Sequence, residues 1–305
     1  GESLLLPDLG GDPWLQMARG WAAGALAAAF IDLLVQLGIR RGCLGQALAT
    51  ALVLMLLLVP GGQRPYEAIA LGPTGPRPVA ERPGLVLMSA LPLVWGETGP
   101  FDPESRPAAA FAALEQEFAV RLIDYIDEPS LRAAQLMLLA QPRALAPAEF
   151  VALDAWVRRG GRLLVLADPD LAWPSRFALG DPRRPPPSSL LPPLLDHWGL
   201  QLASPGRRFA LVRVRDGEAV RLLALETPGR WQSAGGQCRV AERDFLASCA
   251  IGLGRVLLVA DADLLRDRLW AAPTVRGTER HRRLSDNPLI VAAWLDRLAG
   301  LDRQR

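Results

Sequence analysis

Hydrophobic residues after about position 84 are grouped in short unbroken runs, separated by stretches in which they recur at helical spacing. Residues 135–170 show this most clearly. Leu136–Ala140 and residues 163–167 are continuous apolar runs, and residues 147–158 between them read as an amphipathic helix ending at Gly160-Gly161. Runs without polar alternation are typical of parallel strands buried on both faces. The pattern predicts a strand–helix–strand unit with a right-handed crossover.

Similar patterns predict the other elements. We expect buried strands over residues 85–90, 120–125 and 255–260, with helices over 102–118, 190–198 and 287–299. Between residues 202 and 253 the strands become shorter and more polar, at 209–215, at 220–226 and around Cys238 and Cys249. Residues 252–254 (Gly-Leu-Gly) read as a hairpin turn. The segment 171–193 is rich in Pro, which excludes regular structure.

These elements indicate an α/β fold, with a parallel sheet flanked by helices and a small antiparallel insertion around residues 205–253. The predicted boundaries are 1–62 for a membrane anchor, 63–83 for a Pro/Gly-rich linker, 84–300 for the α/β domain and 301–305 for a tail.

The N-terminal part predicts membrane attachment. Residues 20–39 have about the length of a bilayer span but include Asp32, and residues 44–59 are more apolar but shorter. The alternatives are one span, a helical hairpin or an interfacial helix. Arg40 and Arg41 favour a cytoplasmic position for the turn between the two segments. We therefore expect the C-terminal domain on the periplasmic side of the inner membrane, with the lipid bilayer as a partner.

Composition excludes several chemistries. All 34 basic residues are Arg, and the two His are His197 and His281. A chain without Lys has no P-loop or Schiff-base lysine, and two His cannot build a multi-histidine metal site. The formal net charge of +2 gives no argument for nucleic acid. No G-x-S-x-G occurs, so we expect no catalytic nucleophile, no bound metal and no cofactor.

Two of the three Cys residues are candidates for a disulfide bond. Cys238 and Cys249 are separated by a segment that reads as two strands and a turn, so they could face each other across a hairpin. The alternative is two unrelated buried thiols. A bridge would require an oxidising compartment.

Candidate site residues follow the strands, because ligands of open parallel sheets bind at the carboxyl ends of the strands. The loop at 171–193 contributes further candidates, since long irregular loops are often functional. The resulting set is Trp95, Glu97, Gln141, Arg143, Asp168, Asp170, Trp173, Arg176, Asp261 and Asp263.

The four Asp residues of this set allow two interpretations. They could bind a divalent cation or act as acid and base on a sugar. Alternatively, each Asp at a strand end caps the backbone that follows it. The second interpretation is the commoner one for Asp at such positions.

Four segments together resemble the GldG-like auxiliary proteins encoded with ABC transporters. These segments are LVLMSALPLVWGE, LLAQPRALAPAEFVALDAWVRRGGRLLVLADPD, GLGRVLLVADADLL and SDNPLIVAAWLDRLAG. The resemblance implies a flavodoxin-like domain shaped like a class I glutamine amidotransferase without its catalytic residues. The turn Gln141-Pro142-Arg143 has no thiol where such amidotransferases carry a catalytic Cys.

The sequence therefore predicts a non-enzymatic, membrane-anchored accessory protein of an ABC-type transport or cell-envelope system. Its expected partners are the transporter's permease or ATPase, another envelope component, or a glycan. The alternative is a divalent-metal-dependent transferase or hydrolase acting on sugars through the strand-end aspartates.

Overall fold

The computed structural model describes residues 76–270 and 285–301, except for residues 100, 104, 205, 207–208, 217–218 and 242. The predicted anchor (1–62) and most of the predicted linker lie outside the described residues. Within these described ranges, no helix is both long enough and apolar enough to cross a membrane.

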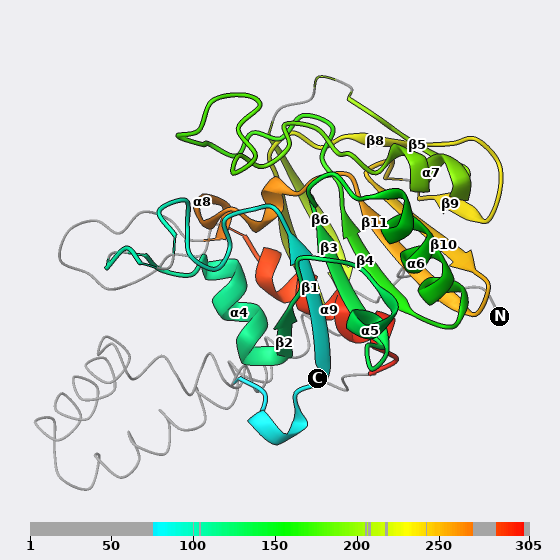
Figure 1. Cartoon of the computed structure of the whole chain (residues 1–305), viewed down its shortest axis with the longest axis horizontal. Helices are drawn as coiled ribbons and strands as arrows, with labels where there is room; N and C mark the ends of the chain where they lie inside the picture. Colours follow the sequence, from blue (N-terminus) through cyan, green and yellow to red (C-terminus); the bar gives the residue numbers. More distant parts are fainter. Residues whose placement is uncertain are drawn as a thin grey trace, which may run out of the picture. The chain divides into compact units, whose positions relative to one another are not determined.

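A seven-stranded sheet forms the centre of the domain, in the order β2-β1-β3-β4-β11-β10-β9 (Figure 1). The strands β2, β1, β3, β4 and β11 are parallel, and β10 and β9 continue the sheet in antiparallel orientation. The parallel part has the strand order of flavodoxin-like sheets. The bounds are β1 Gly84–Ser89, β2 Ala119–Leu122, β3 Leu136–Ala140, β4 Arg162–Leu166, β9 Cys238–Val240, β10 Leu246–Ile251 and β11 Gly254–Val259.

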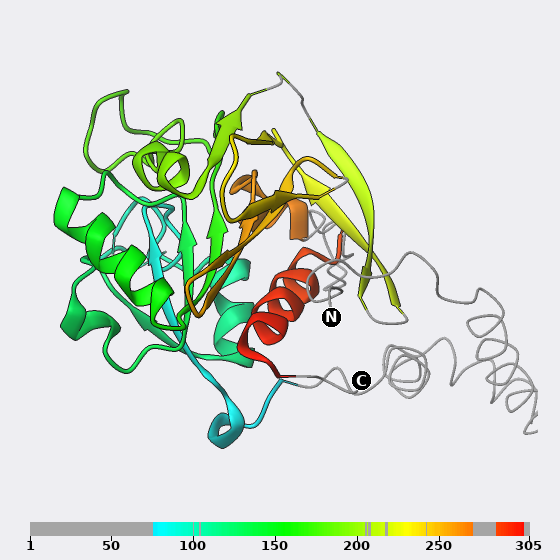
Figure 2. The same cartoon turned by 90° about the vertical axis from the view of Figure 1, so that its right-hand side faces the viewer.

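Helices cover both faces of this sheet, as Figure 2 shows. On one face α9 (Asn287–Ala299) packs on β3, β4 and β11 and contacts α4 (Ala109–Glu117). On the other face α6 (Pro147–Arg158) packs on β11 and contacts α5 (Glu128–Leu131) and α7 (Pro192–Trp198). Short helical segments complete the set: η1 Val79–Glu81, η2 Asp263–Leu265 and α8 Asp267–Trp270.

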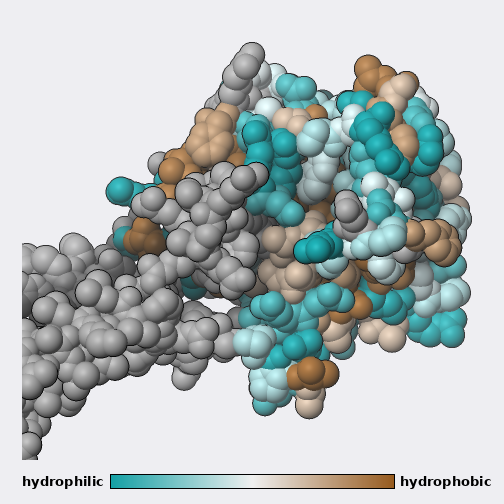
Figure 3. All heavy atoms as spheres, turned by 90° about the vertical axis from the view of Figure 1, so that its left-hand side faces the viewer, coloured by the Kyte–Doolittle hydropathy of each residue, from teal (hydrophilic) through white to brown (hydrophobic). Residues whose placement is uncertain are grey.

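The apolar runs contain no alternating polar residues because these strands are buried on both faces. Every residue of β3 is buried, and Met137, Leu138 and Leu139 have no exposed surface. Removal of such side chains from water contributes about 1.5–3 kcal/mol each. On the face shown in Figure 3, hydrophobic side chains appear as small separate groups among hydrophilic ones.

Several predicted bounds agree with the structure, and two helix starts are wrong. The strand β3 and the helices α6 and α9 match the predicted ranges, and the remaining strands differ from prediction by one to three residues at an end. The helix predicted over residues 102–118 begins only at Ala109, because Pro103 and Pro107 disfavour helical geometry in the residues before them. The helix predicted from residue 190 begins at Pro192, where a residue without N–H is tolerated.

The predicted antiparallel insertion is only partly a separate unit. The strands β9 and β10 join the main sheet, and the other strands of this region form two-stranded sheets. These are β6 (Ala210–Asp216) with β7 (Ala219–Leu225), and β5 (Leu200–Ala203) with β8 (Arg230–Ser233), a pair that the sequence did not predict. Cys238 and Cys249 lie opposite each other on β9 and β10 and form a disulfide.

Both ends of the described domain lie near the edge where the parallel strands begin. Arg77, seven residues before β1, donates to both carboxylate oxygens of Asp296 near the end of α9, at 3.0 and 3.1 Å. Its guanidinium also lies 5.5 Å from the ring centroid of Phe118. The chain therefore enters and leaves the domain at the edge opposite the carboxyl ends of the parallel strands.

Candidate functional site

Three of the four predicted Asp residues come together at the carboxyl edge of the sheet. Asp168 follows β4, and Asp261 and Asp263 follow β11, the neighbouring parallel strand. All three are fully buried. Asp170, the fourth, is exposed at residue level, and its backbone N–H donates to Asp168.

Asp168 connects the ends of two strands through backbone groups. Its Oδ1 accepts the N–H of Asp170 at 2.8 Å, and its Oδ2 accepts the N–H of Ala262 at 3.0 Å. The first bond forms a local Asx turn, and the second links the turn after β4 to the turn after β11. Asp168 is therefore a structural acceptor for two turns.

Asp261 and Asp263 play the same kind of role for more distant segments. Asp261 accepts the N–H of Leu264 at 2.7 Å and that of Glu226, beyond β7, at 2.9 Å. Asp263 accepts the N–H of Ala172, in the Pro-rich loop, at 2.7 Å. The two carboxylates attach the β6–β7 hairpin and the Pro-rich loop to the end of β11.

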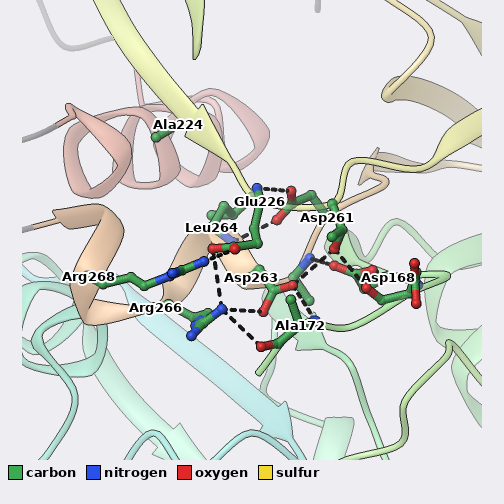
Figure 4. Close-up of polar contacts among 12 residues, drawn as sticks. Asp168, Ala172, Ala224, Glu226, Asp261, Asp263, Leu264, Arg266 and Arg268 are labelled. Atoms are coloured by element: carbon green, nitrogen blue, oxygen red, sulfur yellow. Dashed lines mark hydrogen bonds and ion pairs between the residues drawn. The ribbon is translucent and has the colours of Figure 1, made fainter. Parts of the chain in front are cut away.

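Cationic side chains border this acidic cluster on one side (Figure 4). Arg266 Nη1 lies 3.3 Å from Glu226 Oε2 and 3.8 Å from Asp263 Oδ1, and it donates to the carbonyl oxygen of Ala172 at 3.0 Å. Arg268 forms a second ion pair with Glu226. Because Arg266 and Glu226 are both largely buried, this network offsets part of the cost of placing carboxylates in the interior.

Burial dominates the protonation of the acidic cluster. Desolvation, together with the charge of Asp263, raises the pKa of Asp168 to about 7. Desolvation and the charges of Asp168 and Asp263 raise the pKa of Asp261 well above its usual range. Desolvation also raises the pKa of Asp263, although the backbone N–H of Ala172 and the charge of Arg266 oppose this. The carboxyls therefore retain protons at pH values where exposed Asp is ionised.

The donor set does not fit a divalent cation. Five of the six carboxylate oxygens of Asp168, Asp261 and Asp263 already accept hydrogen bonds from the protein, and the sixth, Asp263 Oδ1, lies beside Arg266. Mg²⁺ and Ca²⁺ need about six or more oxygen ligands free to coordinate. Across the part of the chain that the structure describes, no three His, Cys, Asp or Glu side chains are grouped to hold a metal.

Gln141 occupies the turn between β3 and α6 with an unusual backbone. Its φ of 40° is the only positive value among the described residues other than Gly. Its buried side chain donates to the carbonyl oxygens of Asp168 and Pro186 at 3.3 and 3.0 Å, and accepts the N–H of Asp168 at 2.8 Å. Its own carbonyl accepts the N–H of Ala90 after β1 at 3.2 Å.

This position is the one where flavodoxin-like sheets bind ligands, between β1 and β3 where the strand order reverses. At this position, Gln141 connects the loops after β1, β3 and β4 with one another and with the Pro-rich loop. A left-handed residue costs roughly 1–2 kcal/mol and persists where surrounding contacts determine it. The amide of Gln141 supplies such contacts, so the turn acts as a structural junction.

The other predicted site residues are three charged side chains and two Trp side chains. Arg143 pairs with the buried Glu149 at 2.9 Å and stacks on Tyr125, which fixes the start of α6. Glu97 accepts the N–H of Arg176 at 2.8 Å, joining the loop after β1 to the Pro-rich loop. Trp95 is exposed, and Trp173 packs partly against the core. None of these side chains joins the acidic cluster.

Four residues around the cluster were not predicted from the sequence, namely Glu226, Thr227, Arg266 and Asn287. Asn287 is fully buried at the start of α9 and exchanges hydrogen bonds with the backbone of Ala224 on β7, both at 2.8 Å. The available signal was Asn287-Pro288 at a helix start, which is typical of a cap. Nothing local indicated that its amide would reach β7.

Comparisons with known proteins give one family and several distant structures. Residues 82–204 match the family model of ABC-transporter auxiliary proteins, described as "ABC-type uncharacterized transport system". No curated protein sequence matches the chain.

Among solved structures, the mmIFT52 N-terminal domain is 15% identical, with 73% of this chain and 99% of that chain covered and a TM-score of 0.45. A putative ThuA-like protein from Parabacteroides merdae ATCC 43184 is 10% identical, with 74% and 93% covered and a TM-score of 0.37. The cytoplasmic protein STM1381 from Salmonella typhimurium LT2 is 11% identical, with 60% and 88% covered and a TM-score of 0.36.

These TM-scores lie below 0.5, so the fold description rests on the strand order of the chain itself. The family match is of a different kind, because it covers β1 to β5 as one continuous segment that includes Gln141 and Asp168. Residues 82–204 therefore match the model of an auxiliary family of ABC-type transport systems, over less than half of the chain.

Proposed function

We propose that the chain is a non-enzymatic, membrane-anchored accessory component of an ABC-type transport system, in which the α/β domain serves as a binding and assembly module. The family match supports the link to transport. Residues 20–59 support the anchor by their composition alone.

The observation that carries the non-enzymatic part is the use of the carboxyl edge as a structural junction. Gln141 fills the turn at which an amidotransferase-like fold would present a nucleophile, and its amide binds the neighbouring loops. The buried aspartates accept backbone N–H groups from four segments of the chain. Groups that hold the fold in this way are not free to bind and turn over a substrate.

The disulfide supports a location outside the cytoplasm. Disulfides persist in oxidising compartments, such as the periplasm, and are rare in the cytosol. The bond between Cys238 and Cys249 joins two strands of the main sheet, so it belongs to the folded state of the domain. The placement of Arg40 and Arg41 leads to the same side of the membrane.

Detergent co-purification tests the proposal. The chain is expressed at native level together with the genes that flank it, extracted in mild detergent and isolated through a tag at its C-terminus. We expect an ATPase and a permease to be recovered in a fixed ratio to the chain. Recovery of the chain alone in every detergent would contradict the accessory role.

A further inference from the structure

Backbone N–H groups from separate segments of the chain end on the buried carboxyls beyond β4 and β11 (Figure 4). Each of three donors has its own acceptor, and the pairs are Ala172 with Asp263, Ala262 with Asp168, and Glu226 with Asp261. The donor–acceptor distances are 2.7, 3.0 and 2.9 Å. These three hydrogen bonds, the latch bonds, attach the start of the Pro-rich loop and the segment after β7 to the turns after β4 and β11.

The carboxyls of the latch bonds have few cations around them. The other charged side chains at this position are those of Asp170, Glu226, Arg266 and Arg268. Both guanidinium groups lie next to Glu226, and Arg266 is also 3.8 Å from Asp263. Within the described part of the chain, neither Asp168 nor Asp261 forms an ion pair. Ionisation of all these carboxyls would therefore leave buried charge without a partner, which is costly.

Neutral groups complete the surroundings of these carboxyls. The turn after β3 contributes the amide of Gln141, α9 contributes that of Asn287, and the segment after β7 contributes the hydroxyl of Thr227. Oδ1 of Asp263 is buried and accepts no hydrogen bond from the described residues, so its charge is offset by Arg266 alone. The closed arrangement is thus stable while carboxyls keep their protons, and their ionisation destabilises it.

We propose that the latch bonds are a pH-sensitive device, in which ionisation of the buried carboxyls opens the latch and releases the Pro-rich loop and the segment after β7 together. Opening admits water to the carboxylates, which removes the cost of their burial. Proteins open locally in this way while the rest of the fold stays intact, and the open form is a minor population. The edge at which flavodoxin-like sheets bind ligands becomes more accessible as pH rises.

The segments open together because the carboxyls influence one another. The charge of Asp263 raises the pKa of Asp168, and the charges of both raise the pKa of Asp261. Opening at one carboxyl hydrates its charge and so changes the protonation of the other two. This inference concerns the domain by itself, and it holds whether or not the domain acts with a transporter.

The pKa values set the direction of the effect. The pKa of Asp168 is about 7 in the closed form and about 3.9 when the carboxyl is hydrated. Between these pH values the open form has released a proton that the closed form keeps, so the opening constant rises about tenfold per pH unit. The contribution of Asp168 levels off above pH 7. Asp261, whose pKa is also well above its usual range, adds to the rise.

Amide hydrogen exchange of the full chain in detergent, measured residue by residue from pH 5 to 8, tests the proposal without any variant. After correction for the intrinsic exchange rates, protection of the amides of Ala172, Ala262 and Glu226 should fall together, by at least about a hundredfold from pH 5 to 7. The amides of β3, which need global unfolding, should stay more strongly protected by at least about tenfold at every pH.

Two results of this titration would overturn the proposal. Protection of the three latch amides that does not change with pH would show that ionisation does not open the latch. Exchange of the latch amides at the rate of the β3 amides at every pH would show that they open only when the whole domain unfolds. The wild-type titration decides the question even where a variant fails to fold.

A pair of variants separates the charge of the latch from its packing. Asp168→Asn should make the pH dependence less steep by about tenfold per pH unit, also at the amides of Ala172 and Glu226, which do not bind Asp168. Thr227→Val removes a hydroxyl that donates to the carbonyl oxygen of Asp170 at 2.7 Å, and no ionisable group. It should increase opening at every pH and keep most of the steepness.

A purely structural contact would give a different pattern. In that case Asp168→Asn would change exchange at Ala262 alone, and equally at every pH. Unchanged steepness at Glu226 in Asp168→Asn, or the same loss of steepness in Thr227→Val, would contradict the pH-sensitive latch. Both experiments use the chain without a partner, so their outcome is independent of the co-purification experiment.

Discussion

Asp168 shows how a single buried side chain makes the domain sensitive to pH. Its carboxyl joins the turns after β4 and β11, and its pKa is raised to about 7, against an unfolded value of about 3.9. Between these values the native state holds a proton that the unfolded state has released. The free energy of unfolding therefore falls as pH rises through this window, and the contribution of Asp168 is lost above it.

We expect the domain to be more stable at pH 5 than at pH 8, by an amount on the order of a few kcal/mol. Denaturant unfolding at a series of pH values measures this. Asp168→Asn should flatten the dependence. Asp181→Asn should leave it unchanged, because Arg183 lowers the pKa of the partly exposed Asp181 to about 2, outside the window. Stability that is constant or rises from pH 5 to 8 would contradict the assignment.

Gln141 gives a second prediction at the residue scale. Gln141→Gly relieves the left-handed backbone but loses the amide, Gln141→Ala loses the amide and keeps the strain, and Gln141→Glu places a carboxylate against two carbonyl oxygens. We expect stability to fall in the order Gly, Ala, Glu, with about 1 kcal/mol between Gly and Ala and a larger step to Glu.

Chemical unfolding measures this order, and limited proteolysis of the loop 171–187 reports on the contact with Pro186. Faster cleavage of that loop should accompany all three variants. A Glu variant as stable as the Ala variant would show that the amide does not bind the carbonyl groups as described.

At the scale of elements, local signals set most boundaries, and distant pairing did not follow from them. The residues of β3, α6 and α9 carry their own periodicity, caps and breakers, so their bounds could be predicted. The meeting of Asp168 and Asp261 could also be predicted, because both follow parallel strands. The pairing of β5 with β8 and the addition of β9 and β10 to the main sheet depend on contacts between distant residues, which no local pattern encodes.

The same limit applied to the candidate site. Asp at a strand end is more often a cap than a ligand, but only the positions of the N–H groups of Ala172, Ala262 and Glu226 show which role these residues have. Arg143 was expected to face a ligand, but Glu149, six residues later, binds it.

Two glycines at helix ends allow a matched comparison at this scale. Gly199 after α7 and Gly300 after α9 are both left-handed, with φ of 78° and 71°. A Cβ at position 199 would overlap the carbonyl of Gly235, whereas a Cβ at position 300 would meet nothing. We expect Gly300→Ala to cost about 1 kcal/mol of stability and Gly199→Ala roughly 2–4 kcal/mol.

Thermal or denaturant unfolding of the two variants checks this difference. Equal destabilisation by both substitutions would mean that the contact with Gly235 is not maintained in solution.

For the whole molecule, the disulfide connects the fold to its compartment. The bond closes a loop with a sequence separation of 11 residues, for which chain entropy gives roughly 2–3 kcal/mol of stabilisation. We expect Cys238 and Cys249 to resist alkylation in the native host until a reductant is added, and the double Cys→Ser variant to unfold at lower denaturant concentration. Complete labelling of both thiols without reductant would place the domain in a reducing compartment.

The arrangement of the domain also bears on how it would work next to a membrane. Arg77 fixes the entry of the chain at the edge where the parallel strands begin, and the buried junction at Gln141 and Asp168 lies at the opposite edge. A tether before Arg77 would therefore attach at the edge away from this junction. The buried junction at the opposite edge would keep the loops around it rigid.

The central claim is that the domain binds partners and performs no chemistry at its strand-end aspartates. The most direct measurement is reconstituted transport, with the chain, ATPase and permease in liposomes and wild type compared with Asp168→Asn. We predict that Asp168→Asn, assayed where it is fully folded, supports transport and co-purifies as the wild type does. Loss of transport by folded Asp168→Asn, with the complex still intact, would contradict the account.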